Sequence, residues 1–386
     1  MLIGAMLAAI TIISLALLVY VYVGYPLLCF VAGLLRRRTV HASTCTPRVS
    51  VLISAFNEAD CIEATVRNKL DQDYPADLFE VIVVSDESMD GTDDIVEQLA
   101  REHPGRVRLL RQEPRAGKTA ALNMASRQAT GDIFVFSDAN SLYGLGALSI
   151  LLEPFADPEV GYVTGRMVYR APDGSLTGEG CSAYMAYENK LRILETSCGS
   201  VVGVDGGIDA VRASNYVEMR PDQQPDFVLP LSVVEQGFRV VHEPRALVYE
   251  DTLSRADDEF RMRVRVILRA WHALRDKAAL LLPWRTGLFS MQLMSHKVLR
   301  YLAPVFQVAL LLSNAALVGH GLVWDVFMIL QGLFYAGALG GYLVRSKSLP
   351  PLLIFPYYLC LLNAAAGVAL ARFLRGDRLV TWQPRT

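Results

Sequence analysis

The stretch Ile133–Asn140, which reads Ile-Phe-Val-Phe-Ser-Asp-Ala-Asn, decides the fold class that the sequence predicts. Consecutive apolar residues without polar alternation indicate a strand of a parallel sheet that is covered on both faces. Asp138 then lies at the carboxyl end of this strand, the edge of an open α/β sheet where ligands bind. A carboxylate with a second oxygen ligand two residues on can hold a divalent cation against phosphates, so Asp138 and Asn140 are candidate metal ligands. The alternative is a turn, because Asp and Asn also favour strand-ending turns.

The composition indicates a protein that is partly embedded in a membrane. Of its 386 residues, 52% are hydrophobic and 20% are charged, and the mean hydropathy is +0.30. The first charged residue is Arg36, so residues 1–35 are long enough for an N-terminal transmembrane helix, which needs about 20 apolar residues. Arginines follow this run and do not precede it, which argues against a cleaved signal peptide and places the N-terminus outside and the next domain in the cytoplasm. A net charge of −2 gives no basic surplus for a nucleic-acid partner.

Residues 46–257 have the pattern of an α/β domain. Predicted strands at Val49–Ser54, Phe79–Ser85, Val107–Leu110 and from Ile133 alternate with predicted helices at Asp60–Leu70, Thr92–Glu102 and Thr119–Ala129. This alternation predicts a mostly parallel, Rossmann-like sheet with right-handed crossovers.

Polar residues follow the carboxyl end of each predicted strand. They are Asn57 and Glu58, Asp86 and Glu87, Arg115 and Lys118, and Asp138. Because these ends meet at one edge of a parallel sheet, the residues outline a site suited to an anionic nucleotide with a metal ion. A P-loop is excluded, because Gln112 stands where that motif needs its first glycine, and no dinucleotide fingerprint follows the first strand.

Ordered motifs in the chain resemble those of family 2 glycosyltransferases. They are Ala55–Glu58, Val84–Thr92, Gly117–Asn123 and Ser137–Asn140, joined by Tyr187–Glu195, Gly203–Gly207 and Asp226–Leu231. The last three are similar to the membrane-bound branch that contains cellulose, hyaluronan and chitin-oligosaccharide synthases. The resemblance implies a GT-A fold, a nucleotide-diphosphate sugar donor, Mg²⁺ or Mn²⁺, and inversion at the anomeric carbon.

The resemblance also implies roles for single residues. The donor would be bound by Phe56, Glu58, Asp86, Lys118 and Asp138, with the metal on Asp138 and Asn140. The family usually has two aspartates at the metal site, so Asn140 removes one negative charge and should weaken metal affinity. Asp226 matches the catalytic base, which would take the proton of the acceptor hydroxyl. Taken by itself, Asp226 also fits a helix N-terminal acid. Asp205 and Gly206 belong to a glycine-rich loop that we expect on the acceptor side.

Residues 258–285 predict a basic amphipathic helix on the membrane surface. The alternative is a solvated arginine face on a core helix. Related synthases carry a Gln-x-x-Arg-Trp motif in this region, at the acceptor and the diphosphate. Only Arg265, Arg269 and Trp271 remain as candidates for these roles.

Residues 286–375 predict about three further transmembrane helices, at 301–319, 322–344 and 349–371, followed by a tail at 376–386. Four spans would place this tail outside, against the charge rule, so one of them could be re-entrant or interfacial. The three C-terminal spans contain only Asp325 as an ionisable residue before Arg372, which gives little material for a sugar channel.

Together these features predict an integral protein of a bacterial inner or plasma membrane with a cytoplasmic GT-A domain. We expect an inverting glycosyltransferase that moves a sugar from a nucleotide-diphosphate donor, a UDP-sugar in the first instance, to a hydroxyl of a lipid-linked or oligosaccharide acceptor at the lipid bilayer. The alternatives are a processive synthase that exports its polymer and a non-catalytic nucleotide-sugar sensor. Export would require a partner protein or a homo-oligomer.

Overall fold

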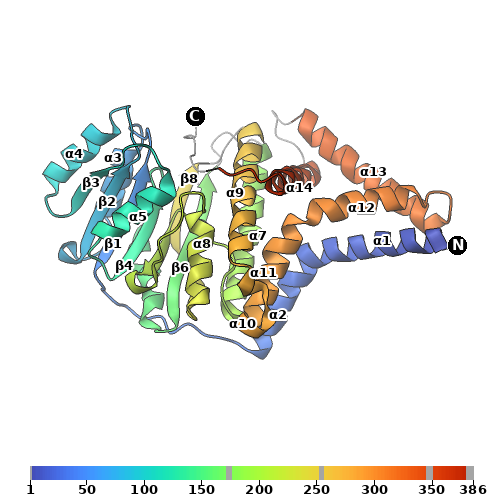
Figure 1. The fold of residues 1–386 in the computed structure, drawn as a ribbon, viewed down its shortest axis with the longest axis horizontal. Coiled ribbons are helices and arrows are strands. Elements are labelled where there is room, and N and C mark those ends of the chain that lie inside the picture. The colour runs from blue at the N-terminus through green and yellow to red at the C-terminus, as the bar shows by residue number, and fades with distance from the viewer. Residues whose placement is uncertain (1, 171–175, 252–255, 345–350, 380–386) are drawn as a thin grey trace.

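The computed structural model describes residues 2–170, 176–251, 256–344 and 351–379. An α/β domain with a central sheet occupies one end of the molecule, and long apolar helices extend from its side (Figure 1). The N-terminal end of α1 Leu2–Val19 and the turn between α12 Ala303–Ala315 and α13 Leu322–Leu343 lie far from the sheet.

The sheet has eight strands in the order β3-β2-β1-β4-β7-β6-β8-β5. The strands are β1 Val49–Ala55, β2 Phe79–Ser85, β3 Val107–Arg111, β4 Ile133–Asp138, β5 Leu142–Tyr143, β6 Val160–Arg170, β7 Asp209–Arg212 and β8 Arg239–Asp251. Strands β1 to β4 are parallel, as the sequence predicts, whereas β7 runs antiparallel to β4 and β5 antiparallel to β8. The sheet is therefore mixed, and the four predicted strands form its parallel half.

Both faces of the parallel half are covered, which explains the apolar runs of its strands. Every residue of β1 and β2 is buried. On β1, Val51 and Ile53 face a core closed by α3 Ile62–Leu70, α4 Thr92–Glu102 and α6 Ala147–Leu152, while Leu52 faces a core closed by α5 Lys118–Gln128 and α8 Pro225–Glu235. This alternation is the two-residue period of a strand.

The N-terminal helix is longer than one membrane crossing. It comprises α1 Leu2–Val19, a π-helical turn at Tyr20–Gly24 and α2 Tyr25–Leu35. Its 34 residues would be about 50 Å long at 1.5 Å per residue, against about 30 Å of hydrocarbon. Helix α1 packs beside α12, whereas Tyr25 and Cys29 of α2 pack against Leu191 and Cys198 of α7 Leu176–Cys198. The second half of the predicted span is thus docked on the α/β domain.

The segment predicted as a surface helix is α9 Ala256–Asp276, and protein covers it on two sides. Ala270, Ala273 and Leu274 belong to the core of the sheet domain, and Val264, Ile267 and Leu268 pack against α14 (Figure 1). Phe289 and Leu293 of α11 also enter the core of the sheet domain. Residues beyond 257, where the sequence predicts the end of the α/β domain, therefore contribute to the core on the second face of the sheet.

The remaining helices are α10 Pro283–Thr286, α11 Leu288–Leu293, α12 Ala303–Ala315, α13 Leu322–Leu343 and α14 Pro351–Leu374, with a π-helical turn at Met294–Leu299. In the described ranges, three helices are long and apolar enough to cross a membrane: residues 2–35, 322–343 and 353–374. The pair 288–299 and 303–315, bent by 58°, would make a fourth as a broken span. After α14 the chain returns to the α/β domain, where the Asp377 carbonyl accepts a hydrogen bond from His272 Nε2 at 2.7 Å.

Candidate active site

One cavity of about 540 Å³ joins the carboxyl edge of the sheet to the apolar helices. At the sheet edge it is lined by Glu58, Lys118, Asp138, Asn140 and Asp226. At the other end its wall comes from the π-helical turns, α7, α9 and α14. The predicted metal and base residues, and Glu58, Lys118 and Asp138 of the predicted donor residues, are therefore gathered at one end of a continuous space.

Lys118, Asp138 and Asp226 form the charged centre of this site. Lys118 begins α5, Asp138 ends β4 and Asp226 lies in the first turn of α8, after a proline at the first helical position. Lys118 Nζ lies 2.6 Å from Asp138 Oδ1 and 3.6 Å from Asp226 Oδ1. Burial lowers the pKa of Lys118, but the two carboxylates outweigh burial and raise it above its ordinary value. The ammonium stays charged and holds the two acids together.

The position of Asp226 suits two roles, accepting a proton and stabilising the N-terminus of α8. Burial raises the pKa of its carboxyl from the ordinary 3.8, and Lys118 opposes this rise. A carboxylate with a raised pKa is a stronger base, which suits a general base. Its position in the first turn of α8 also satisfies the alternative prediction of a helix N-terminal acid.

Gly206 allows the loop between α7 and β7 to approach the Asp226 carboxylate. Its φ is +87°, and a Cβ there would lie 2.5 Å from Asp226 Cγ. The Gly206 amide donates to Asp209 Oδ2 at 2.9 Å, which fixes the loop. Asp209 Oδ1 is buried without a hydrogen-bond partner in the described ranges, and burial raises the pKa of this carboxyl to about 7.

Only some of the predicted donor residues line the cavity in the structure. Glu58 lines the cavity. Asp86 is fully buried, and its oxygens accept from the amides of Ala116 at 2.8 Å and Gly117 at 3.0 Å. Asp86 thereby holds the loop that leads to Lys118, and its contact with the donor stays a prediction. Phe56 lies outside the cavity lining, under the Arg115 guanidinium, which is 3.4 Å from the ring centroid.

Asp138 and Asn140 fit a metal ion that is shared with substrate phosphates. Both side chains line the cavity, and together they offer one carboxylate and one amide oxygen. Among the described residues no group of three or more His, Cys, Asp or Glu is arranged to hold a metal. Mg²⁺ is often held by one or two carboxylates plus phosphates, so this donor set fits an ion that arrives with a nucleotide diphosphate.

The residues predicted for the acceptor or diphosphate side have different surroundings. Asp205 lines the cavity, but Arg192 of α7 binds both of its oxygens at 2.5 Å. Arg265 lines the cavity from α9. Trp271 is outside the lining, because it packs between Tyr301 and Phe373 at ring-centroid distances of 5.8 and 5.7 Å. An acceptor contact by Trp271 stays a prediction, and it would require the ring to leave this packing.

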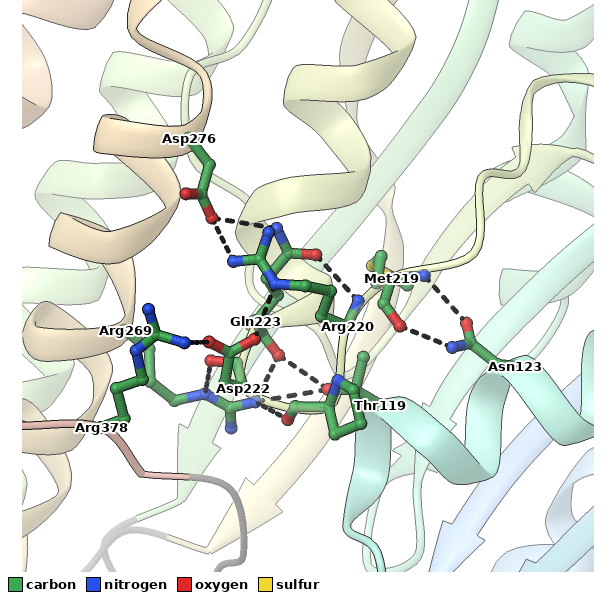
Figure 2. A network of polar contacts seen from close by, with 10 residues as sticks. Thr119, Asn123, Met219, Arg220, Asp222, Gln223, Arg269, Asp276 and Arg378 are labelled. Atoms are coloured by element: carbon green, nitrogen blue, oxygen red, sulfur yellow. Dashed lines mark hydrogen bonds and ion pairs between the residues drawn. The ribbon is translucent and has the colours of Figure 1, made fainter.

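Arg269 faces the loop that precedes the base (Figure 2). Its guanidinium donates to the Gln223 carbonyl, to the Pro221 carbonyl at 3.3 Å and to Thr119 Oγ1 at 3.3 Å. The predicted diphosphate contact would compete with these bonds. The side chain of Asn123 in α5 holds the same loop, because its Nδ2 donates to the backbone carbonyl of Met219 and its Oδ1 accepts from the Met219 amide.

Sequence reasoning missed the residues that close the far end of the cavity. They are Tyr22, Tyr184, Glu188, His296, Lys297, Arg300 and Asn363. The basic residues among them precede the predicted span at 301. The sequence does contain one signal for this end of the cavity. His296, Lys297 and Arg300 lie within little more than one helical turn beside an apolar run, and ionisable residues near a membrane segment often belong to functional sites.

The mixed sheet, with an acid-and-lysine cluster at the carboxyl edge of its parallel half, defines the GT-A fold of glycosyltransferases. The mannosyltransferase PcManGT from Pyrobaculum calidifontis, solved in complex with GDP-Man and Mn²⁺, shares this fold with a TM-score of 0.74 at 24% sequence identity, over 95% of this chain and 99% of that chain.

The sequence comparison adds a match over part of the chain. Residues 50–203 match the model of glycosyl transferase family 2. Glycosyltransferase AglD of Haloferax volcanii is 37% identical over 132 residues, 33% of this chain and 21% of that protein. Poly-β-1,6-N-acetyl-D-glucosamine synthase of Staphylococcus aureus MSSA476 is 27% identical over 206 residues, 52% of this chain and 49% of that protein. The chain thus spans about half or less of these relatives.

Proposed function

We propose that this protein is an inverting glycosyltransferase that moves a sugar from a nucleotide-diphosphate donor to a hydroxyl of a membrane-associated acceptor. The observation that carries the proposal is the continuous cavity, which joins the Lys118, Asp138 and Asp226 cluster to helices apolar enough to cross a membrane. Donor and acceptor can thus approach from opposite ends, one from water and one from the bilayer.

The sheet end of the cavity suits the donor. Glu58 offers a carboxylate to the nucleoside, and Lys118 offers a charge to the diphosphate. Asp138 and Asn140 would hold Mg²⁺ or Mn²⁺, which supplies charge neutralisation of the leaving diphosphate when it is bound. The Pyrobaculum structure contains GDP-Man, so GDP-sugars belong beside UDP-sugars among the candidate donors.

Asp226 supplies the proton acceptor for inversion. A single displacement at the anomeric carbon needs one base for the acceptor hydroxyl on the face opposite the diphosphate. Asp226 lies beside Lys118 at the cavity wall, and Gly206 leaves room for its carboxylate. The intact cluster of Lys118, Asp138 and Asp226 favours catalysis over a sensor that only binds nucleotide sugars.

The proposal is tested by sugar transfer with purified full-length protein in lipid nanodiscs. A panel of UDP- and GDP-sugars is supplied with lipid extract, and products are identified by mass spectrometry. We expect metal-dependent glycosylation of a lipid-soluble acceptor, with the anomeric configuration inverted. Retention of configuration, or donor binding without turnover across the whole panel, would overturn the proposal.

A further inference from the structure

The end of the cavity that faces the apolar helices, called here the membrane end, has polar walls whose groups already have partners. Asn363 of α14 accepts from the Tyr22 hydroxyl at 3.0 Å and donates to Gln307 at 3.1 Å. Arg300 forms an ion pair with Glu188 at 2.6 Å and lies over the ring of Tyr184 at 5.3 Å. These amide, carboxylate and aromatic groups are therefore engaged within the protein.

The other carboxylates near this end are also engaged. The second oxygen of Glu188 lies 3.2 Å from His296 Nε2, and His296 Nδ1 lies 2.7 Å from Glu195. Asp205 is held by Arg192. Carboxylates and exposed ring faces are the groups that commonly recognise sugars, and few of them remain open here.

Lys297 differs from its neighbours. It lines the cavity, and within the described ranges its ammonium has no hydrogen bond and no carboxylate within 4.0 Å. A Cβ at Gly203 would lie 2.4 Å from Lys297 Nζ, so this glycine leaves the room that the ammonium occupies. The ammonium is 5.6 Å from the ring centroid of Phe227, the residue after the base. The cation at the membrane end thus lies close to the residue that follows the base.

We propose that Lys297 binds a phosphate group of a lipid-linked acceptor. Glu188 and Glu195 attract the Lys297 ammonium only from farther away, and both carboxylates are already paired, with Arg300 and His296. A confined ammonium without a direct ion pair is unfavourable, and a phosphate would compensate it with a charge-assisted hydrogen bond. Leu362 and Ala366 of α14 line the same cavity and suit the hydrocarbon of such a lipid. An uncharged glycolipid would leave the cation unpaired.

This inference rests on the proposed function and names the acceptor class for it. The acceptor hydroxyl meets Asp226, and the phosphate that links its sugar to the lipid remains unchanged on Lys297. The positive charge therefore selects among acceptors and takes no part in bond making.

Binding without donor tests the inference separately from turnover. Full-length protein in nanodiscs is titrated with a polyprenyl phosphate and with the polyprenol of the same length, and bound lipid is measured by native mass spectrometry. We expect at least tenfold tighter binding of the phosphate, a loss of that preference in Lys297→Gln, and its retention in Lys297→Arg. Lys190→Gln removes a charge from the exposed side of α7 and should change nothing. Equal binding of the two lipids, or an unchanged preference in Lys297→Gln, would overturn the inference even if transfer occurs.

Kinetics separate the acceptor from the donor diphosphate as the ligand of Lys297. With a phosphate-linked saccharide acceptor, Lys297→Gln should raise the acceptor KM at least tenfold and leave the donor KM within twofold. The same saccharide on an uncharged lipid should show no such rise. A raised donor KM, or an equal effect on both acceptors, would assign Lys297 to the donor or to packing. Free inorganic phosphate should compete only weakly, because it lacks the hydrocarbon.

Discussion

Gly206 has no side chain, and this leaves the room in which the carboxylate of the base, Asp226, lies. A methyl group would lie 2.5 Å from Asp226 Cγ at a φ of +87°, so the carboxylate or the loop must move. We expect Gly206→Ala to lower kcat about 100-fold, since displacements of about 1 Å in an active site have effects of that size. Gly105→Ala is the matched control, because Gly105 also has a positive φ, of +79°, but open space around it. Equal activity of the two variants in a transfer assay would contradict the role of Gly206.

The metal site should respond to charge at residues 138 and 140. Asp138→Ala removes the one carboxylate that the motif offers, and we expect it to abolish metal-dependent donor binding measured by calorimetry. Asn140→Asp adds a second carboxylate, and we expect half-maximal activity at about tenfold lower Mn²⁺ because hard cations prefer charged oxygen ligands. An unchanged Mn²⁺ titration in both variants would refute coordination by this pair.

The residues of the sheet end could be predicted from sequence because their local signals are strong. Asp138 ends an apolar strand, Lys118 begins a helix and Asp226 follows Pro225 at a helix start. Lys297 and Arg300 could not be found in the same way, since their place at the cavity depends on the packing of helices that are distant in the sequence. Trp271 was assigned by resemblance to a motif that is incomplete here, and its packing between Tyr301 and Phe373 is not visible in that motif.

At the scale of the elements, the loop at residues 217–224, which leads to the base Asp226, is held in place by contacts with α9 and with the tail. Arg220 pairs with Asp276 of α9 at 2.5 Å, and Arg378 of the tail pairs with Asp222 at 3.2 Å (Figure 2). Arg269 adds bonds to the Pro221 and Gln223 carbonyls. Burial lowers the pKa of Arg269 to about 10, so its guanidinium stays charged at neutral pH.

We expect Arg269→Lys to lower kcat by about 10- to 100-fold while donor affinity stays within threefold, because an ammonium cannot span several carbonyls and a charged hydrogen bond contributes about 1.5–3 kcal/mol. Arg378→Gln is the control from the same network, at an exposed pair, where contributions are small. A loss of donor affinity in Arg269→Lys without a change in kcat would instead support the predicted diphosphate contact.

The elements themselves were predictable to different extents. Strands β1 to β4 follow apolar runs, and their positions agree with the prediction within a residue or two. Strands β5 and β7 have two and four residues and acquire their pairing from β8 and from β4 and β6, so no local pattern announces them. Helix α9 has the amphipathic pattern that was expected, but its apolar residues face the protein on two sides.

For the whole molecule, the contacts of the tail lead to a prediction about the side of the membrane on which the last helix ends. Asp377 contacts His272 of α9, and Leu379 packs on the cluster between α9 and α14. We therefore expect the end of α14 to lie on the side of the catalytic domain, which removes the conflict with the charge rule and makes α14 an interfacial or re-entrant segment.

Cysteine labelling in sealed vesicles tests this arrangement. In a background without native cysteines, Arg375→Cys should react from the same side as Asp77→Cys in the catalytic domain. His320→Cys, in the turn between α12 and α13 at the far end of the molecule (Figure 1), should react from the opposite side. Labelling of Arg375→Cys together with His320→Cys would show four crossings.

The most direct measurement for the whole molecule compares Asp226→Asn with the wild type in both donor binding and sugar transfer. Because Asn keeps the shape but accepts no proton, we expect transfer to fall at least 100-fold while the nucleotide Kd stays within threefold. In the wild type, transfer should decline as the pH falls through a value above 3.8, because burial raises the pKa of the Asp226 carboxyl and only its ionised form is a base. Near-normal transfer by Asp226→Asn, with the same acid limb as the wild type, would contradict the assignment of Asp226 as the base.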